Sequence, residues 1–247
     1  MVLVAVVAFA GLFFYRASTS ADRRATERAE LAREVEHMQT VNTWIQDTTF
    51  NTPVPGTAGW PAPTSGRAKR LWVINRMLVD GRVWERQVME RHGVKSDGPP
   101  PAWGTPRYWG DARAFPEVGT YLEGRAAAMA EIRKTSAARA EERAAALARE
   151  SGLPAREIRE IFPGDFGAGA LDAAGLVDAM LRLHRHLVRV DPRVHHAGGN
   201  QLRWEREDDL SRSQELLARM NAAADSTKQA QARRLSREFA ALAGAID

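Results

Sequence analysis

The chain has 247 residues, a formal net charge of +4 at pH 7 and no cysteine. This length is sufficient for one large or two small domains with a hydrophobic core. The lack of cysteine excludes disulfides, thiolate metal sites and cysteine nucleophiles, so stability must come from packing. The net charge is a mild basic bias at this length and does not indicate a nucleic-acid-binding protein.

The first fifteen residues, MVLVAVVAFAGLFFY, carry no charged side chain and are followed by Arg16. A helix of this length spans about 22 Å, whereas a bilayer core is about 30 Å thick, so a membrane span also needs residues 17–21. We predict that residues 1–20 form a transmembrane anchor in a bacterial inner membrane. The alternative is a cleaved signal peptide, although no basic residue precedes the apolar run.

The orientation of this anchor receives conflicting signals. Arg16, Arg23 and Arg24 follow the apolar run and favour a cytoplasmic body under the positive-inside rule. Short N-terminal anchors on bodies of this size usually serve export. We expect a periplasmic or otherwise extracytoplasmic body, with a cytoplasmic body as the alternative.

Residues 21–50 are rich in helix formers and predict an amphipathic stalk. Its seam positions follow one another at spacings of four, three, four and three: Leu31, Val35, Met38, Asn42 and Ile45. We predict that Leu31, Val35, Met38 and Ile45 bind a protein partner, as in a short coiled coil. The alternative is that this seam packs against the body of the same chain.

Residues 51–118 form a segment rich in proline, glycine and tryptophan. Residues 52–66 predict a loop, and residues 93–110 predict a second loop whose aromatic rings pack against the body. Between them, residues 71–89 have two apolar halves around Asp80-Gly81. This pattern predicts either a β-hairpin with a type I′ turn or two short helices broken at Gly81.

Residues 119–247 predict a helical domain, so the expected fold class is mainly α, with long antiparallel helices following the anchor and stalk. The expected helices are at 120–150, 154–161, 171–190, 208–223 and 227–244. The helix at 171–190 should bury one apolar face, made of Leu176, Met180, Leu183, Leu187 and Val190. The helices at 208–223 and 227–244 should direct Leu210, Leu217 and Met220, and then Leu235, Phe239, Leu242 and Ile246, inward. The glycine-rich stretch at 163–169 is expected to be a hinge.

The histidines and acidic residues predict no catalytic or metal site. His184 and His186 lie about 200° apart on a helix and cannot hold one ion together, although a site from His186, Asp191 and His196 is conceivable. The acidic residues at 205–209 fit the start of a helix better than a pair of catalytic carboxylates. No nucleophile or phosphate-binding motif is present. We therefore expect no cofactor and no enzyme activity.

Arg182, Arg185 and Arg189 form a basic stripe opposite the leucines of the same helix. Guanidinium groups suit carboxylate or phosphate, so the stripe is a candidate contact for an acidic lipid or an acidic protein. The alternative is a solvated face paired with nearby acids.

An apolar N-terminal helix that continues into an amphipathic helix and a body resembles the organisation of type IV pilin-like proteins and pseudopilins. That resemblance implies a filament subunit. The sequence departs from the pattern at Ala5, where those proteins usually carry glutamate, and in its helical body, where their heads are rich in strands. The leading hypothesis is a single-pass membrane protein that acts through protein contacts as a scaffold, assembly subunit or chaperone-like tether in a cell-envelope complex. An anchored enzyme with a site assembled from distant residues is the other alternative.

Overall fold

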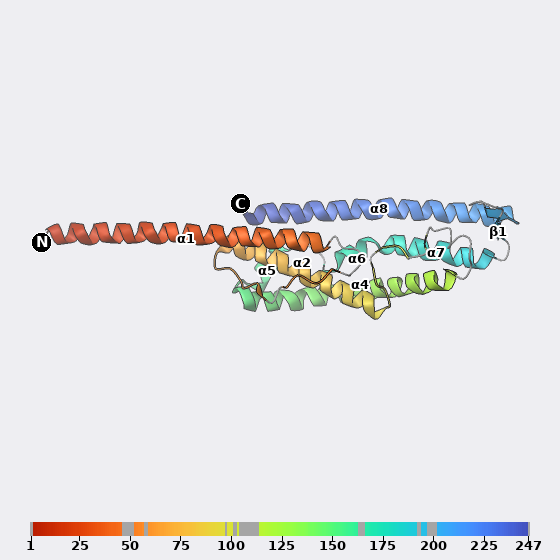
Figure 1. Ribbon diagram of the computed structural model, residues 1–247, viewed down its shortest axis with the longest axis horizontal. Helices are drawn as coiled ribbons and strands as arrows, with labels where there is room; N and C mark the ends of the chain where they lie inside the picture. The colour runs from red at the N-terminus through yellow and green to blue at the C-terminus, as the bar shows by residue number, and fades with distance from the viewer. Residues whose placement is uncertain are drawn as a thin grey trace.

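The chain is mainly helical in the computed structural model (Figure 1), as the sequence predicts. The structure describes residues 2–45, 52–56, 59–96, 98–100, 103, 114–162, 166–191, 194–196 and 202–246. Side chains are described within these ranges from residue 22 onward, except at 194–196, 202, 235 and 238–246. The elements are α1 (Val2–Ile45), α2 (Gly66–Arg91), α4 (Phe115–Ser151), α5 (Ala155–Ile161), α6 (Ala168–Asp172), α7 (Ala174–Val190), β1 (Val194–His196), β2 (Leu202–Trp204) and α8 (Glu207–Ile246).

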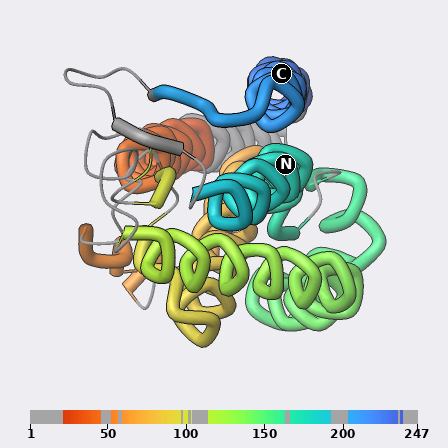
Figure 2. The backbone as a smooth tube through the Cα atoms, turned by 90° about the vertical axis from the view of Figure 1, so that its right-hand side faces the viewer, coloured from red at the N-terminus to blue at the C-terminus, as the bar shows by residue number. Residues whose placement is uncertain are grey.

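The long helices lie side by side along the long axis of the molecule (Figures 1 and 2). The part of α1 near its C-terminal end packs on α2, α2 packs on α4, α4 on α7, and α7 on α8. Successive long helices from α4 onward are antiparallel, as predicted, whereas α1 and α2 run in the same direction (Figure 1). The start of α2 and the end of α8 therefore lie toward the end of the body from which α1 extends.

Two apolar clusters form most of the core. The larger one joins α2, α4, α5, α6 and α7 and includes Trp72, Trp84 and Phe166. The second lies between α4, α7 and α8 and includes Leu183, which is 1% exposed. The larger cluster draws residues from both sides of the predicted boundary at residue 118, and α4 itself begins at Phe115, before that boundary.

Residues 71–89 form the middle of the unbroken helix α2, so the predicted hairpin is wrong, and so is the alternative of a break at Gly81. Tertiary contacts outweigh the local turn preference of Asp80-Gly81. Asp80 accepts a hydrogen bond from Arg143 of α4 and lies 4.0 Å from Arg76. Burial raises the pKa of Asp80, although Arg143 and Arg76 oppose this rise. At Gly81, an added Cβ would already be in contact with the ring of Phe166 at 3.4 Å.

The C-terminal part of the chain differs from the prediction in two ways. The expected helices at 208–223 and 227–244 are one helix, α8. The buried Thr227 lies within it, and its Oγ1 donates to the carbonyls of Ala223 at 2.9 Å and Asp172 at 3.2 Å. A two-stranded antiparallel ribbon, β1 and β2, replaces part of the loop expected at 191–200.

The apolar face of α7 is confirmed. Met180, Leu183, Leu187 and Val190 are buried, and Leu176 packs against the same cluster. On α8, Leu216 is buried instead of the predicted Leu217, which is 41% exposed. The side chains of Leu235, Phe239, Leu242 and Ile246, also predicted to face inward, lie outside those described.

The described residues of the second predicted loop are held against the body by side chains of the helices. Val94 and Pro100 are buried, and Trp103 packs against the second core cluster. Tyr121 of α4 donates to the carbonyls of Ser96 at 2.7 Å and Gly98 at 2.9 Å. Packing of the second loop against the body is thus confirmed for these residues, while Tyr108 and Trp109 lie outside the described residues.

The glycine-rich stretch at 163–169 is docked on α2 in its described part. Phe166 packs on Trp84 with ring centroids 5.5 Å apart. The buried carboxylate of Glu85 accepts a hydrogen bond from the backbone N–H of Ala170. This part therefore serves as a packed connection rather than the free hinge that the sequence predicted.

Candidate functional site

The contact between α1 and α2 is the candidate functional site, because it joins the helix that carries the apolar N-terminal segment to the body. Glu30 of α1 reaches the turn that precedes α2. Its Oε1 accepts hydrogen bonds from the backbone N–H of Thr64 at 2.8 Å and from Thr64 Oγ1 at 2.9 Å, and its Oε2 accepts from the N–H of Ser65 at 2.9 Å. Ser65, the N-cap of α2, forms no side-chain capping bond of its own. Glu30 thus secures the start of α2 from a neighbouring helix.

These hydrogen bonds also set the ionisation of Glu30. Desolvation alone would raise its pKa, but the hydrogen bonds from Thr64 and Ser65 outweigh it and lower the pKa from 4.5 to about 2. The carboxylate is therefore charged throughout the physiological pH range. The positive end of the α2 dipole favours a negative charge at this position as well.

A buried polar pair lies one turn further along α1. Glu34 and Asn75 are both 0% exposed. Asn75 Nδ2 donates to the carbonyl oxygen of Glu34 at 3.0 Å and lies 3.5 Å from its Oε2. The carboxylate also lies 3.3 Å from Arg33 Nε and 3.3 Å from His37 Nδ1. Because unpaired buried polar groups are costly, this arrangement favours one position of α1 against α2.

Aromatic side chains complete the contact. His37 stacks on Trp60, with ring centroids 4.0 Å apart and an interplanar angle of 5°. Trp44, 2% exposed, donates from Nε1 to the carbonyl of Thr52 at 3.2 Å, and Arg86 of α2 lies over its ring at 4.6 Å from the centroid. The aromatic groups thereby hold the segment between α1 and α2 against both helices.

The predicted stalk seam lies beside this contact rather than at its centre. Leu31, Val35, Met38 and Ile45 are each half-buried, and Asn42 is exposed. Among the side chains of α1 that the structure describes, from residue 22 onward, the buried ones are Glu34, Val41 and Trp44 instead. Ile45 packs against the cluster of Val41, Trp44 and Val79, so it contributes to internal packing. The partner-binding role of Leu31, Val35 and Met38 stays a prediction.

The sequence pattern did not identify the residues that make this contact. Glu30, Glu34 and Asn75 have the composition of a solvated face, and their partners lie 34 to 41 residues away in the chain. The one indication of this buried face in the sequence was that Glu34, Val41 and Trp44 recur at spacings of seven and three. Because Glu34 is charged, this pattern did not predict a buried face.

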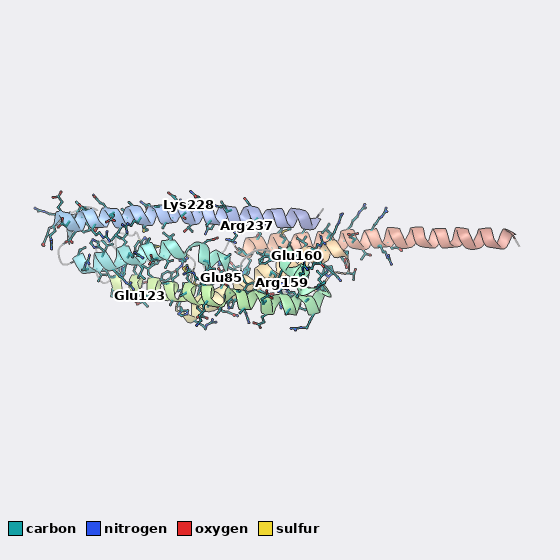
Figure 3. The ribbon with its side chains drawn as sticks, turned by 180° about the vertical axis from the view of Figure 1, so that it is seen from behind. Glu85, Glu123, Arg159, Glu160, Lys228 and Arg237 are labelled. Carbon is teal, nitrogen blue, oxygen red and sulfur yellow. The ribbon has the colours of Figure 1, made fainter. Side chains whose placement is uncertain are left out.

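The basic stripe of α7 is accounted for by nearby groups. Arg182 lies 2.9 Å from Asp178, Arg185 lies 3.2 Å from Glu123 of α4, and Arg189 donates to His186 Nδ1 at 2.9 Å. Figure 3 shows Glu123 toward the end of the body away from the N-terminal part of α1. Contact of this stripe with an acidic lipid or protein stays a prediction.

Arg182 also lines a small surface pocket between α7 and α8, together with Asp178, Ala179, Leu216 and Arg219. Arg219 is 2.5 Å from Glu215, so both arginines at this pocket have acidic partners. The pocket gives no indication of a particular ligand.

The two histidines of α7 are buried. His186 Nε2 lies 3.0 Å from Ser213 Oγ and 3.3 Å from the carbonyl of Asp209. Because Arg189 can only donate, His186 Nδ1 accepts and Nε2 carries the proton. Ser213 Oγ in turn donates to the Asp209 carbonyl at 2.9 Å. This arrangement joins α7 to α8 and does not present His186 as a base to Ser213.

His184 packs edge-on against Phe115 at a centroid distance of 6.0 Å. Burial lowers its pKa, although the charge of Glu123 opposes the shift. The side chains of His195 and His196 lie outside those described.

Two further predictions concern the acidic residues at 205–209 and metal binding. The acidic residues Glu207, Asp208 and Asp209 occupy the first turn of α8, where the helix dipole favours them, as predicted. Within the described residues, no group of three metal-ligating side chains comes together.

No helix of the described part of the chain has both the length and the apolar character needed to cross a membrane. The side chains of residues 1–20 lie outside that part, so the anchor stays a prediction.

Comparisons with known proteins give no match: no family model fits the sequence, and neither a curated protein nor a solved structure shows significant similarity to it.

Proposed function

We propose that the chain is a single-pass membrane protein whose helical body binds other proteins, as a scaffold, assembly subunit or tether in a cell-envelope complex. The observation that supports this proposal most directly is that α1 is one continuous helix from Val2 to Ile45. Its first residues have the composition of a membrane segment, and its later residues contribute Glu34, Val41 and Trp44 to the interior of the protein.

This continuity has a mechanical consequence. Because no loop separates the apolar segment from the docked part of α1, the body is attached to the proposed anchor without a flexible linker. A protein held in this way presents its surfaces at a fixed height and direction relative to the bilayer, which suits a scaffold or a tether. The half-buried Leu31, Val35 and Met38 lie in the C-terminal half of α1, before the buried Val41 and Trp44, and are the proposed partner contact.

The anchor is tested on the full-length chain in isolated membranes. We expect intact mass to show that Met1 or Val2 remains at the N-terminus, and an alkaline carbonate wash to leave the protein in the membrane. A mature chain that begins near Ala21, or release by the wash, would refute the anchor. Labelling of single introduced cysteines from each side of the membrane would then decide between the extracytoplasmic body that we propose and a cytoplasmic body.

The partner contact is tested by purification in mild detergent and by thermal melting of the same samples. We expect replacement of Leu31, Val35 and Met38 by serine to remove a protein that co-purifies in stoichiometric amount and to leave the melting temperature nearly unchanged. The matched control replaces Ala25, Ala29 and Ala32, which are exposed on α1, by serine. If the triple variant keeps its partner and melts at a much lower temperature, the seam is internal packing and the proposal is wrong for this surface.

A further inference from the structure

Cationic side chains gather where α1 leaves the body toward its apolar segment. On α1, Arg23, Arg24 and Arg28 are exposed, and none of them forms an ion pair within the described part of the chain. They lie between the apolar run and Glu30, which is the first residue in the described part of α1 whose side chain forms a hydrogen bond to the body.

The first turn of α2 adds three more cations at this end. Glu30 fixes Thr64 and Ser65 beside α1, so Arg67, Lys69 and Arg70 follow directly from a point of contact between the two helices. Arg70 lies 3.6 Å from Glu157 of α5, while Lys69 makes no ion pair among the described residues. In Figure 3, Arg159 and Glu160 mark α5 toward this same end of the body. The other arginines of α5 are neutralised, since Arg159 lies 2.7 Å from Glu141 and Arg156 lies 2.9 Å from Glu160.

We name as the basic end the six residues Arg23, Arg24, Arg28, Arg67, Lys69 and Arg70. Among the contacts that the structure describes, the acidic side chains within the same segments or in direct contact with them are Asp22, Glu27, Glu30 and Glu157, and Arg67 also has an interaction partner in the folded chain. Glu30 keeps its negative charge, because the Thr64 and Ser65 groups that donate to it are neutral. The five cations other than Arg67 still outnumber these four carboxylates, so the group as a whole presents an excess of positive charge.

The distance from the proposed membrane span is short. Glu30 follows Ala21 by nine residues, which corresponds to about 13 Å along a helix. The screening length at physiological ionic strength is about 8 Å, and arginine and lysine side chains reach several ångströms further. Basic residues this close to an anionic surface are attracted to it.

We propose that the basic end contacts the anionic headgroups of the same bilayer that holds α1. This inference rests on the proposed membrane anchor and adds the lipid class that the body recognises. The basic stripe of α7 is less suited to this role, because Arg182 and Arg185 have acidic partners and Glu123, which pairs with Arg185, lies toward the opposite end of the body.

The natural lack of cysteine allows a site-specific test on the full-length chain. Gly66 is exposed, and no atom lies within 4 Å of a Cβ added there. Gly66→Cys carrying an environment-sensitive fluorophore is reconstituted into vesicles of phosphatidylcholine alone, or of phosphatidylcholine with phosphatidylglycerol. Some of the phosphatidylcholine carries a quencher on its headgroup. The control label is at Ser211→Cys, an exposed site in the first turns of α8.

We expect phosphatidylglycerol to increase quenching at position 66 about threefold or more, and high salt to reverse the increase. The label at position 211 should not respond. The charge-depleted variant Arg24→Gln, Arg28→Gln, Lys69→Gln should lose the increase and keep its thermal stability, because none of these side chains forms an ion pair in the described part of the chain.

Equal quenching in both kinds of vesicle, or an increase that survives in the charge-depleted variant, would overturn the lipid contact. In the first case the basic end would instead be available to an acidic protein. Failure of the anchor itself is recognised separately, because a chain without an anchor is released from all vesicles by alkaline carbonate. Retention without a response to lipid charge refutes only the further inference.

Discussion

Replacement of Glu30 by glutamine should weaken the docking of α1 on α2 at neutral pH. The carboxylate accepts hydrogen bonds from two backbone N–H groups and one hydroxyl at 2.8 to 2.9 Å. A glutamine side chain keeps one acceptor oxygen but presents an NH₂ group to the remaining donors. At least one N–H before α2 would therefore lose its partner.

The magnitude follows from the capping role and from the ionisation of Glu30. Its pKa is about 2 in the folded chain, whereas the ordinary value for a glutamate side chain is 4.5. One pKa unit corresponds to about 1.36 kcal/mol, but solvent screening at this partly exposed site reduces the realised energy. Loss of an N-terminal helix cap costs about 0.5–2 kcal/mol. We expect Glu30→Gln to lower the free energy of unfolding by about 1–2 kcal/mol.

The pH dependence has a defined sign. Since the pKa of Glu30 is lower in the folded state than in the unfolded state, its stabilisation is complete above pH 4.5 and is lost as the pH falls toward 2. The difference between the native chain and Glu30→Gln should therefore shrink over that range and should be constant at neutral pH.

The assay is guanidinium denaturation of the full-length chain in detergent, followed by tryptophan fluorescence. Trp44 and Trp60 lie at the contact of α1 with α2 and its preceding loop and report on it directly. Glu36→Gln is the matched control, because Glu36 is an exposed carboxylate on the same helix. Equal stabilities of Glu30→Gln and the native chain at pH 7 would refute the capping role, and so would a difference that persists undiminished at about pH 2.

Three further predictions concern the core around α7. Leu183→Asp should unfold the region of α4, α7 and α8, because an unpaired carboxylate would replace a side chain that is 1% exposed. The cost is several kcal/mol, roughly the whole stability of a small domain, and an unchanged circular-dichroism melt would contradict this prediction. Gly119→Ala should lower the free energy of unfolding by about 1–3 kcal/mol, because the added Cβ would lie 2.8 Å from His184 Nε2. In the control Gly175→Ala the added Cβ meets no atom within 4 Å, so that variant should not be destabilised; similar melting temperatures for the two variants would show that His184 moves aside freely. The stability of the native chain should fall as the pH drops below 6.5, since burial lowers the folded-state pKa of His184, and His184→Gln should reduce this loss; identical pH profiles would exclude His184 as its source.

The fold class and the helix faces that depend on a strong local period could be predicted from the sequence. On α7, the apolar residues recur at spacings of three and four, and the structure buries Met180, Leu183 and Leu187 as expected. The prediction failed where distant contacts override local preference. Asp80-Gly81 has the composition of a turn, but Arg143 and Phe166, both far away in sequence, stabilise it within α2.

The candidate site was less accessible to sequence analysis because its central groups are polar. A periodicity argument assigns glutamate and asparagine to the solvent side of a helix. Glu34 and Asn75 are nevertheless buried, and the Asn75 amide donates to the carbonyl oxygen of Glu34 across the two helices. Leu31, Val35 and Met38 have the better apolar spacing and lie at the margin of the contact instead.

The polar character of this contact bears on how the body is positioned. An apolar contact between α1 and α2 could shift by one turn, about 5.4 Å, with little change in buried area. With Glu34 and Asn75 at the centre, the same shift would separate the buried Asn75 amide from the Glu34 carbonyl and carboxylate, and it would also separate Glu30 from Thr64 and Ser65. The polar groups therefore select a single register of α1 against the body. If residues 1–20 span a bilayer, that register also sets the height of the body above the membrane, and with it the distance between the basic end and the lipid headgroups.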